Sequence, residues 1–430
     1  KKRQHQKPVT PDSEVKIEVP LKQVRTPKNA PVEYWTRKKK WPRRLFEFCP
    51  EEWGTRSVPT NPGFIQLLTS TSTAISEAKS DAYFSDTCIR YLKSKGCYIV
   101  RHMSGLAGIA DEDKQVCQKL LKRDSVTPTH TMTVFDDDAL EYVVSRGPIK
   151  NETGVIRLIA QCIVPSAELE MCRGRLGSLR LIESINEPWI KSSALQHGVK
   201  PVKRGEQPQS RLPTPQPDYA AGFSKQGLTM NQREKLKPLL GQSGETSVLQ
   251  GTENMIFPFL TAEVKSSTVS LELADRQNTH SITRAMRGVV ELFKIVGRED
   301  ELHRRILGFS IVHDHAAVEV YAHYPIMGPE QTQYYRDEVM PHKISRQNKA
   351  LRWASYNFVL GVYHHWAQQH YDRLRSAIDQ LPEEIDFSAD GRTIGRATIP
   401  TTAQDSIHFS HEGSLCPRPR LQTRQREGSS

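Results

Sequence analysis

Cysteines and long apolar runs are scarce in this sequence, and each shortage excludes a class of protein. The 430 residues include seven cysteines, an odd number with no Cys-x-x-Cys spacing. This pattern argues against a disulfide-stabilised secreted domain and against a cysteine zinc site. No stretch approaches the roughly 18 apolar residues of a transmembrane helix, and the first residues lack the apolar segment of a signal peptide. We therefore expect a nuclear or cytoplasmic protein that is not secreted.

Aromatic residues are also few, and the central part of the chain carries little net charge. Aromatic residues make up 7% of the chain and the mean hydropathy is −0.57, values that indicate a substantial disordered fraction. The formal net charge of +11 comes mainly from residues 1–60, which hold 15 lysines and arginines against 7 acidic residues. Residues 61–388 are close to neutral, so their composition shows no basic groove of the kind that binds DNA.

These patterns divide the chain into four regions. Residues 1–60 and 388–430 are expected to be disordered tails, residues 61–148 a helical extension and residues 149–387 the folded domain. The first tail contains a basic run that predicts a nuclear localisation signal or a phosphate-binding arm, with a solvated charge run as the alternative. The basic residues of this run are Arg37, Lys38, Lys39, Lys40, Arg43 and Arg44.

Hydrophobic spacing predicts the elements of the folded domain. Apolar residues that recur every three positions, Leu176, Leu179, Ile182 and Ile185, predict a helix. Apolar or alternating runs predict strands, and a turn joins the last two of them. The expected strands are 219–223, 257–265, 307–311 and 318–322. Further helices are expected at 229–241, from about 278 to Gly297, and at 348–381.

Two carboxylates and a lysine are predicted to meet at the ends of two strands. Asp218 opens the first strand, and Glu263 and Lys265 close the second. Side chains at i and i+2 share one face of a strand, so Glu263 and Lys265 point to the same side. If the strands pair, the three side chains suit a hard divalent cation, with the lysine placed to orient a water or to stabilise developing negative charge. A salt bridge that closes a sheet edge is the structural alternative.

The Glu-x-Lys spacing alone is not informative, because it occurs elsewhere in the chain. Glu-Val-Lys is repeated at 14–16, in the Pro- and Lys-rich tail, and Glu-Ala-Lys occurs at 77–79, in a segment with a helical pattern. Residues two apart do not share a helix face. Only the copy at 263–265 follows an apolar strand and precedes an amphipathic helix, so it is the copy expected to carry chemistry.

The order of the predicted elements and several phrases of sequence resemble the PD-(D/E)xK phosphodiesterase superfamily. More closely, the chain resembles an uncharacterised family of fungal proteins with a nuclease-like domain of this type. The phrases are PDY at 217–219, FPFLTAEVK at 257–265, ADRQN at 274–278, FSIVHDH at 309–315 and HYP at 323–325. The resemblance covers residues 150–385. It implies an α/β fold with a restriction-endonuclease-like αβββαβ core and a mixed central sheet, next to the helical extension and the disordered basic tails.

The resemblance also implies roles for individual residues. Asp218 and Glu263 correspond to metal ligands for Mg²⁺ or Mn²⁺, and Lys265 corresponds to the catalytic lysine. Gln277 is expected beside the site, at the start of the following helix. A carboxylate from the preceding helix often completes the metal set in this superfamily, and here Glu187 is the first candidate and Glu183 the second.

The implied activity is Mg²⁺-dependent hydrolysis of nucleic acid, with DNA favoured over RNA. Two alternatives stay open. One is a nuclease-like fold that no longer cleaves and binds nucleic acid or protein. The other is a zinc enzyme built on histidines, because imidazole nitrogens are common zinc ligands. His313 and His315 share a predicted strand face, and His364, His365 and His370 lie on the last predicted helix.

Overall fold

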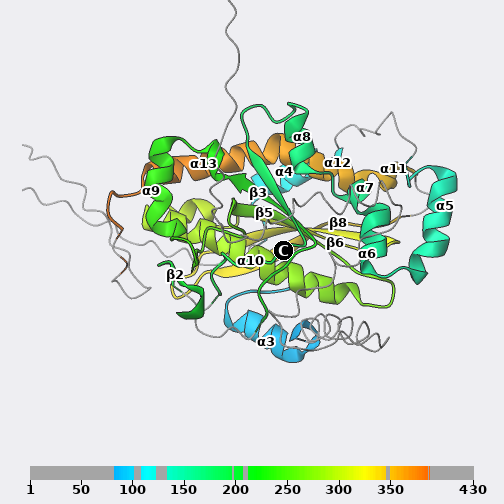
Figure 1. Cartoon of the computed structure of the whole chain (residues 1–430), viewed down its shortest axis with the longest axis horizontal. Coiled ribbons are helices and arrows are strands. Elements are labelled where there is room, and N and C mark those ends of the chain that lie inside the picture. The colour runs from blue at the N-terminus through cyan, green and yellow to red at the C-terminus, as the bar shows by residue number, and fades with distance from the viewer. Residues whose placement is uncertain are drawn as a thin grey trace, which may run out of the picture. The chain divides into compact units, whose positions relative to one another are not determined.

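A mixed sheet of six strands forms the centre of the structure (Figure 1). The computed structural model describes residues 82–100, 108–122, 133–195, 198–206, 212–344, 349–385 and 387. The basic run at 37–44 and the two predicted tails lie outside these residues. The strands are β1 (Leu181–Ile185), β3 (Tyr219–Ser224), β5 (Met255–Val264), β6 (Gly308–His313), β7 (Ala317–Ile326) and β8 (Gln333–Lys343). They stand side by side in chain order, which places β1 and β8 at the two edges.

The pairing within the sheet is mostly antiparallel. Only β5 and β6 run parallel, and the long helix α10 (Leu271–Ile295) connects them. The other neighbouring strands pair antiparallel. A separate two-stranded ladder joins β2 (Val202–Lys203) to β4 (Glu245–Thr246). The prediction of an α/β fold with a mixed central sheet is therefore confirmed.

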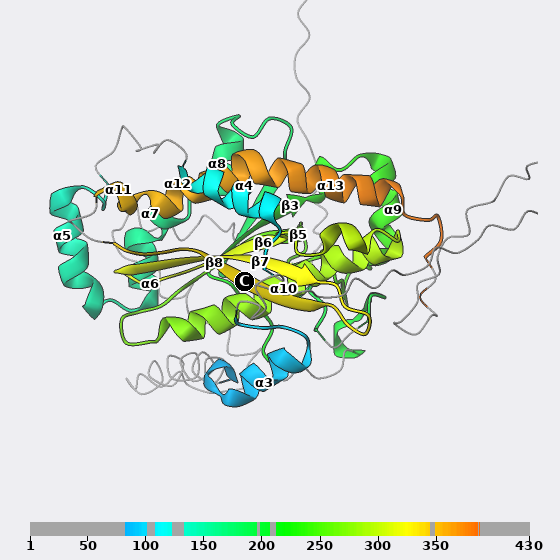
Figure 2. The same ribbon diagram turned by 180° about the vertical axis from the view of Figure 1, so that it is seen from behind.

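Helices cover both faces of this sheet. Figures 1 and 2 show α10 along one face, with α12 (Ala354–Gly361) and α13 (Ala367–Asp379) along the other. A π-helical turn, η8 (Val362–Trp366), joins α12 to α13. The remaining α-helices among the described residues are α3 (Asp86–Ser94), α4 (Asp111–Lys122), α5 (Asp137–Arg146), α6 (Glu152–Val155), α7 (Gln161–Ile163), α8 (Ala167–Cys172), α9 (Met230–Leu240) and α11 (Lys349–Arg352). No helix in the described part of the chain is long and apolar enough to cross a membrane.

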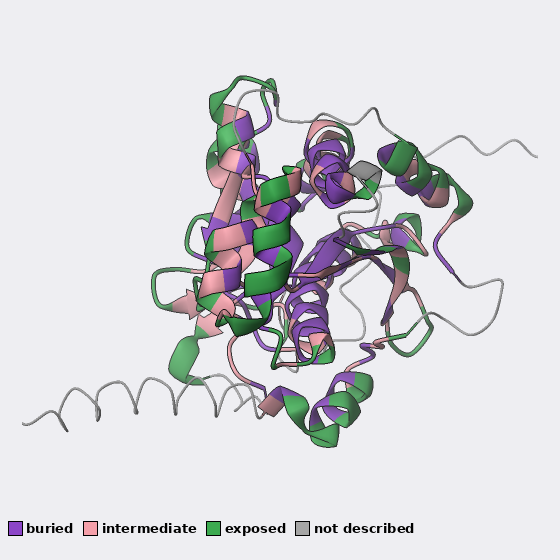
Figure 3. Ribbon diagram, turned by 90° about the vertical axis from the view of Figure 1, so that its right-hand side faces the viewer, coloured by how far each residue is buried: buried purple, intermediate pink, exposed green. Residues whose placement is uncertain are grey.

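The sheet and α10 hold the core because their sequences are apolar on the sides that meet. All ten residues of β5 are buried, as expected for a strand covered on both faces. Gly308 begins β6 where a side chain would meet the backbone oxygen of Phe259 and the side chain of Ile282 in α10. The close approach of helix and strand therefore requires glycine at this position. Figure 3 shows the buried residues in purple along the sheet and the helices against it.

Several predicted elements are confirmed and one is wrong. The predicted strands at 219–223, 257–265, 307–311 and 318–322 correspond to β3, β5, β6 and β7, and the predicted helix at 229–241 corresponds to α9. The described part of the helical extension contains α3, α4 and α5. The helix predicted from Leu176 to Ile185 is wrong, because residues 181–185 form strand β1 and pair with β3. The sequence also did not predict β8.

Candidate active site

Strands β3 and β5 bring the two predicted carboxylates to one point. Tyr219 of β3 pairs with Ala262 of β5, so the register extended by one residue sets Asp218 opposite Glu263. Both side chains leave the sheet on the same face, because side chains alternate along a strand. Two acids directly opposite each other repel, and the pair therefore lowers stability when both are ionised. Asp218 is also tied to β5, since its Oδ2 accepts a hydrogen bond from the backbone N–H of Val264 at 2.8 Å.

Lys265 places its ammonium group among the acids. Its Nζ lies 3.8 Å from Glu263 Oε2 and 3.0 Å from Glu152 Oε2, and it donates a hydrogen bond to the backbone oxygen of Val264 at 2.8 Å. The backbone N–H of Lys265 donates to the oxygen of His313, which continues the pairing of β5 with β6. Only 5% of the Lys265 side chain is exposed. The backbone of the sheet thus fixes the lysine, and the prediction that it meets Glu263 is confirmed.

Glu152 is the third carboxylate of this cluster. It is the first residue of α6, where Asn151 caps the helix by accepting a hydrogen bond from the backbone N–H of Gly154. The cap sets the direction of the first helical turn, which carries the Glu152 carboxylate to Lys265. The Glu152 side chain is 43% exposed, whereas that of Glu263 is 5% exposed. The cluster therefore has one partly open side, formed by Glu152.

The three acids and one lysine leave the cluster with surplus negative charge. Burial raises the pKa of Asp218 to about 6, against the opposing charge of Lys265. Burial, followed by the charge of Asp218, raises the pKa of Glu263 well above its usual range. Burial would lower the pKa of Lys265, but the charges of Glu263 and Glu152 more than offset this and raise it. The lysine therefore stays charged, and the environment of Glu263 favours its protonated form more than water would.

Comparison with known proteins assigns a family to the chain. The sequence model of a domain of unknown function, DUF7924, matches residues 139–378, more than half of the chain. The chain belongs to the DUF7924 family. No curated protein and no solved structure matches it. The DUF7924 match contains Glu152, Asp218, Glu263 and Lys265, so the whole acidic cluster is part of the family domain.

The structure places the other predicted site residues of the DUF7924 domain elsewhere. Glu187 is exposed in the segment after β1 and does not belong to a helix. Glu183 lies within β1 and accepts hydrogen bonds from the hydroxyls of Ser166 and Tyr219. Gln277 lies inside α10 rather than at its start, because the helix already begins at Leu271. No hydrogen bond or ion pair among the described residues links Gln277 to Lys265 or the acids, and its Oε1 is buried without a hydrogen-bond partner.

The donors of the cluster fit a magnesium ion better than a zinc ion. Within the described residues, no group of three or more His, Cys, Asp or Glu side chains is arranged to hold a metal ion. Magnesium, however, is commonly held by one or two carboxylates together with waters and substrate phosphates. Asp218 and Glu263 supply such a pair. Burial raises the pKa of both carboxyl groups, and the charge of Lys265 offsets this only in part. His313 is buried with its pKa lowered to about 4 by desolvation, and His315 lies in the turn after β6.

One further residue beside the acids comes from outside the DUF7924 match. The Tyr83 hydroxyl lies 2.9 Å from His280 Nδ1 of α10, and the Tyr83 side chain is buried. Burial raises the pKa of Tyr83, and the nearby Glu263 carboxylate raises it further. The guanidinium of Arg276 donates to the backbone oxygen of Tyr83, which anchors this segment on α10. Nothing in the local sequence around Tyr83 indicates this position.

Proposed function

We propose that this DUF7924 protein hydrolyses phosphodiester bonds in nucleic acid with the help of Mg²⁺ or Mn²⁺. The observation that carries the proposal is the convergence of three carboxylates on one buried lysine where β3 begins and β5 ends. The element order α8, β1, β3, β5, α10, β6 also corresponds to the αβββαβ order of restriction-endonuclease-like folds. The restriction-endonuclease-like core is thus part of the proposal.

The residues of the cluster divide the work of such a reaction. A bound magnesium ion supplies a Lewis acid that polarises the phosphate and lowers the pKa of a coordinated water. Asp218 and Glu263 would hold this ion through their carboxylate oxygens. Lys265 keeps its proton because of the surrounding acids, and its N–H groups can donate to phosphate oxygens as negative charge develops. Glu152 orients the Lys265 ammonium from the open side of the cluster.

A cleavage assay with matched variants tests this proposal. The full chain would be incubated with supercoiled plasmid, linear duplex DNA, single-stranded DNA and RNA, in Mg²⁺, Mn²⁺ or EDTA. We expect cleavage that requires the metal and that is lost in Glu263→Gln, which keeps the shape of the side chain and removes its charge. Glu187→Gln is the control, because Glu187 is exposed and lies outside the cluster. Equal Mn²⁺ affinity, by calorimetric titration, in the parent, Glu263→Gln and Asp218→Asn would rule out the metal site.

A second candidate function is a nuclease-like fold that binds without cleaving. The ion pair between Lys265 and Glu152 favours it, because the lysine already has its hydrogen-bond partners at 2.8 and 3.0 Å. Under this alternative the cluster closes the end of the sheet. A parent protein that binds nucleic acid or another protein and cuts none of the four substrates would support the binding function over the enzyme.

The basic run at 37–44 bears on localisation and on the partner. It lies outside the described residues, so its role rests on its charge alone. We propose that it directs nuclear import or contacts phosphates without sequence preference. Deleting residues 1–60 should reduce nuclear accumulation of a fluorescent fusion or flatten the salt dependence of DNA binding. No change in either measurement would make the run a solvated tail.

A further inference from the structure

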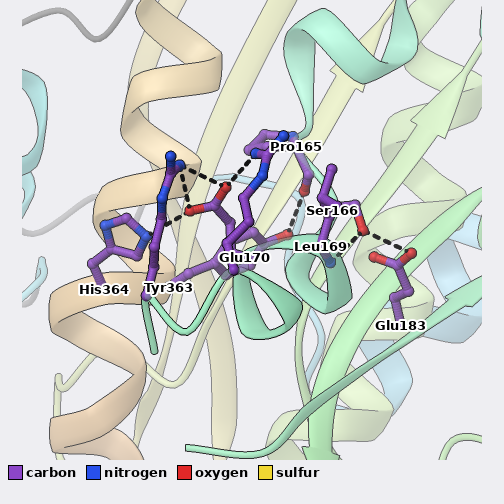
Figure 4. Close-up of polar contacts among 9 residues, drawn as sticks. Pro165, Ser166, Leu169, Glu170, Glu183, Tyr363 and His364 are labelled. Carbon is purple, nitrogen blue, oxygen red and sulfur yellow. Dashed lines mark hydrogen bonds and ion pairs between the residues drawn. The ribbon is translucent and has the colours of Figure 1, made fainter. Parts of the chain in front are cut away.

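A second charged cluster surrounds Glu170, on the side of the sheet opposite to α10. Glu170 belongs to α8, and only 1% of its side chain is exposed. Arg173 donates to Glu170 Oε1 at 3.0 Å, and Arg175 contacts both carboxylate oxygens at 3.2 and 3.3 Å. His364 of η8 contributes its Nε2 at 3.0 Å from Glu170 Oε2. Figure 4 shows His364 of η8 beside the Glu170 carboxylate.

The turn Arg173-Gly174-Arg175 brings both guanidinium groups to the same acid. Gly174 has a φ of +70°, a conformation that glycine adopts without strain. The backbone N–H groups of Gly174 and Arg175 donate to the oxygens of Met171 and Glu170, which closes the C-terminal end of α8. The chain therefore reverses direction at Gly174, and the side chains of the two flanking arginines contact Glu170 of the preceding helix α8. The geometry of the pair is set by the backbone.

The second cluster has surplus positive charge. Burial would raise the pKa of Glu170, but the hydrogen bonds from His364 and Arg173 and the charge of Arg175 more than offset this and lower it. Glu170 is therefore ionised and neutralises only one of the two guanidinium groups. The side chains of Arg173 and Arg175 are 45% and 51% exposed, and each uses a single nitrogen toward Glu170. Each keeps further N–H donors that no described residue accepts from.

A tyrosine and a polar network connect this cluster to its surroundings. Tyr356 of α12 is partly buried and close enough to Glu170 and Arg173 for their charges to affect its pKa, which burial raises. Its ring lies 5.3 Å from that of Trp353, in an edge-on contact. At the other end of α8, the backbone N–H of Ala167 donates to the hydroxyl of Tyr219, the residue after Asp218. The arginine pair is thus fixed to the strand that carries the acidic cluster.

We propose that Arg173 and Arg175 bind a phosphate group of a nucleic-acid backbone. Two half-exposed guanidinium groups held by one buried carboxylate present a planar fork, which matches phosphate oxygens. The inference rests on the proposed function only for the identity of the ligand as nucleic acid, because the surplus charge would attract a free phosphate as well.

Binding in EDTA tests this inference separately from cleavage. The full chain, without divalent metal, would be titrated against a fluorescein-labelled single-stranded DNA oligonucleotide at several salt concentrations. The double variant Arg173→Gln/Arg175→Gln should bind about tenfold more weakly, and the slope of log affinity against log salt should fall by about one unit. Arg180→Gln is the matched control, since Arg180 is exposed in the same region and donates to the backbone oxygen of Gly177 rather than to Glu170.

A footprint on the unmodified chain covers the case in which the double variant does not fold. Phenylglyoxal labels accessible arginines, and mass spectrometry should show that the oligonucleotide protects Arg173 and Arg175 and leaves Arg180 reactive. Excess inorganic phosphate, added as a competitor, distinguishes a nucleic-acid phosphate from a free phosphate as the ligand. If the oligonucleotide still protects the two arginines, the ligand is the nucleic-acid backbone. If free phosphate abolishes the protection by the oligonucleotide, the assignment to nucleic acid is overturned. Unchanged affinity in the double variant, an equal loss in Arg180→Gln, or no binding by the parent would also overturn the inference. Binding without any cleavage would support it and remove the nuclease proposal.

Discussion

The two charged clusters of this domain are opposite in composition. At the end of β5, one lysine is surrounded by three acids, whereas at the end of α8 one acid is surrounded by two arginines and a histidine. Both are attached to β3, the first through Asp218 and the second through Tyr219. In each cluster the buried central charge, Lys265 or Glu170, is neutralised by the side chains around it. These surrounding side chains carry more charge than the central group, and their sign is opposite to that of the proposed ligand. The surplus is negative in the first cluster and positive in the second, and under the proposed function these signs suit the cation and the anion of a metal-bound phosphodiester.

The largest effect is expected on the cleavage rate, when Lys265, the central cation of the acidic cluster, is replaced. Lys265→Ala should lower the cleavage rate by about two orders of magnitude or more, the usual scale for a group that stabilises developing charge. Mn²⁺ affinity should stay near the parent value, because Asp218 and Glu263 remain. Single-turnover cleavage and calorimetric titration measure the two quantities.

Lys191→Ala is the control for Lys265→Ala. The Lys191 side chain is also 5% exposed, and its Nζ donates to the backbone oxygen of Gln242 and lies 3.4 Å from Glu253 Oε2, neither of which belongs to the acidic cluster. This variant should cleave at the parent rate once it is shown to be folded. A Lys265→Ala protein that cuts as fast as the parent would contradict the mechanism.

Removing the central acid of the other cluster should affect stability rather than cleavage. Glu170→Gln leaves the guanidinium groups of Arg173 and Arg175 without their shared carboxylate and should lower the free energy of unfolding by about 2 kcal/mol. Glu183→Gln should cost less, about 1 kcal/mol, because Glu183 accepts from hydroxyls rather than from cations. Urea denaturation measures both values. If both variants lose the same free energy of unfolding, the positive charge around Glu170 does not contribute to the stability of the domain.

The sequence allowed the centre of the sheet to be predicted and not its edges. β5 and β6 are buried along their whole length. Their sequences show an apolar run at 257–262 and a regular alternation at 307–311, and both patterns predict strands. β1 and β8 are the edge strands, and their patterns are mixed. In β1, Leu181 and Ser184 are buried while Ile185 is exposed, so the apolar spacing does not follow the burial. An edge strand has neighbours on one side only and needs fewer apolar residues, which removes the signal that periodicity depends on.

The acidic cluster was predictable to the same limited extent. Asp218, Glu263 and Lys265 sit at the ends of strands, where alternation is a local property of the chain. Glu152 lies on a short helix more than a hundred positions before Lys265, and only the fold brings the two together. The apolar spacing of residues 176–185 predicts a helix, and Glu187 is the first candidate for the third carboxylate only if that helix exists. Residues 181–185 form strand β1, so the argument for Glu187 no longer holds.

A pH series tests the charge state of Glu263 in the acidic cluster. The folded-state pKa of Glu263 lies above its unfolded value of about 4.3, so its stabilising contribution is present at low pH and is lost as pH rises through the folded pKa. Glutamine has no such proton. The parent should therefore lose stability relative to Glu263→Gln from about pH 5 upward, by at most about 1.4 kcal/mol per pH unit.

Thermal unfolding of both proteins in EDTA, between pH 5 and 9, measures this difference, and taking the difference cancels the contribution of the buried histidines. Saturating Mg²⁺ should stabilise the parent and not the variant at the upper end of the range, because the ion replaces the proton on Glu263. Parallel pH profiles for the two proteins would contradict the raised pKa.

The smallest effect is expected for Glu152, the acid that the structure places in the cluster. Its variant is compared with that of Glu187, the acid that the sequence favoured. The Glu152 side chain is 43% exposed, so its ion pair with Lys265 should contribute only about 0.5 kcal/mol to stability. Glu152→Gln should lower cleavage by about threefold to tenfold, through a less well oriented lysine. The charge of Glu152 also raises the pKa values of Asp218 and Glu263, so its removal should shift the acidic limb of the pH–rate profile to lower pH. Glu187→Gln should change neither the rate nor the profile, and a shift in that variant alone would return the third carboxylate to Glu187.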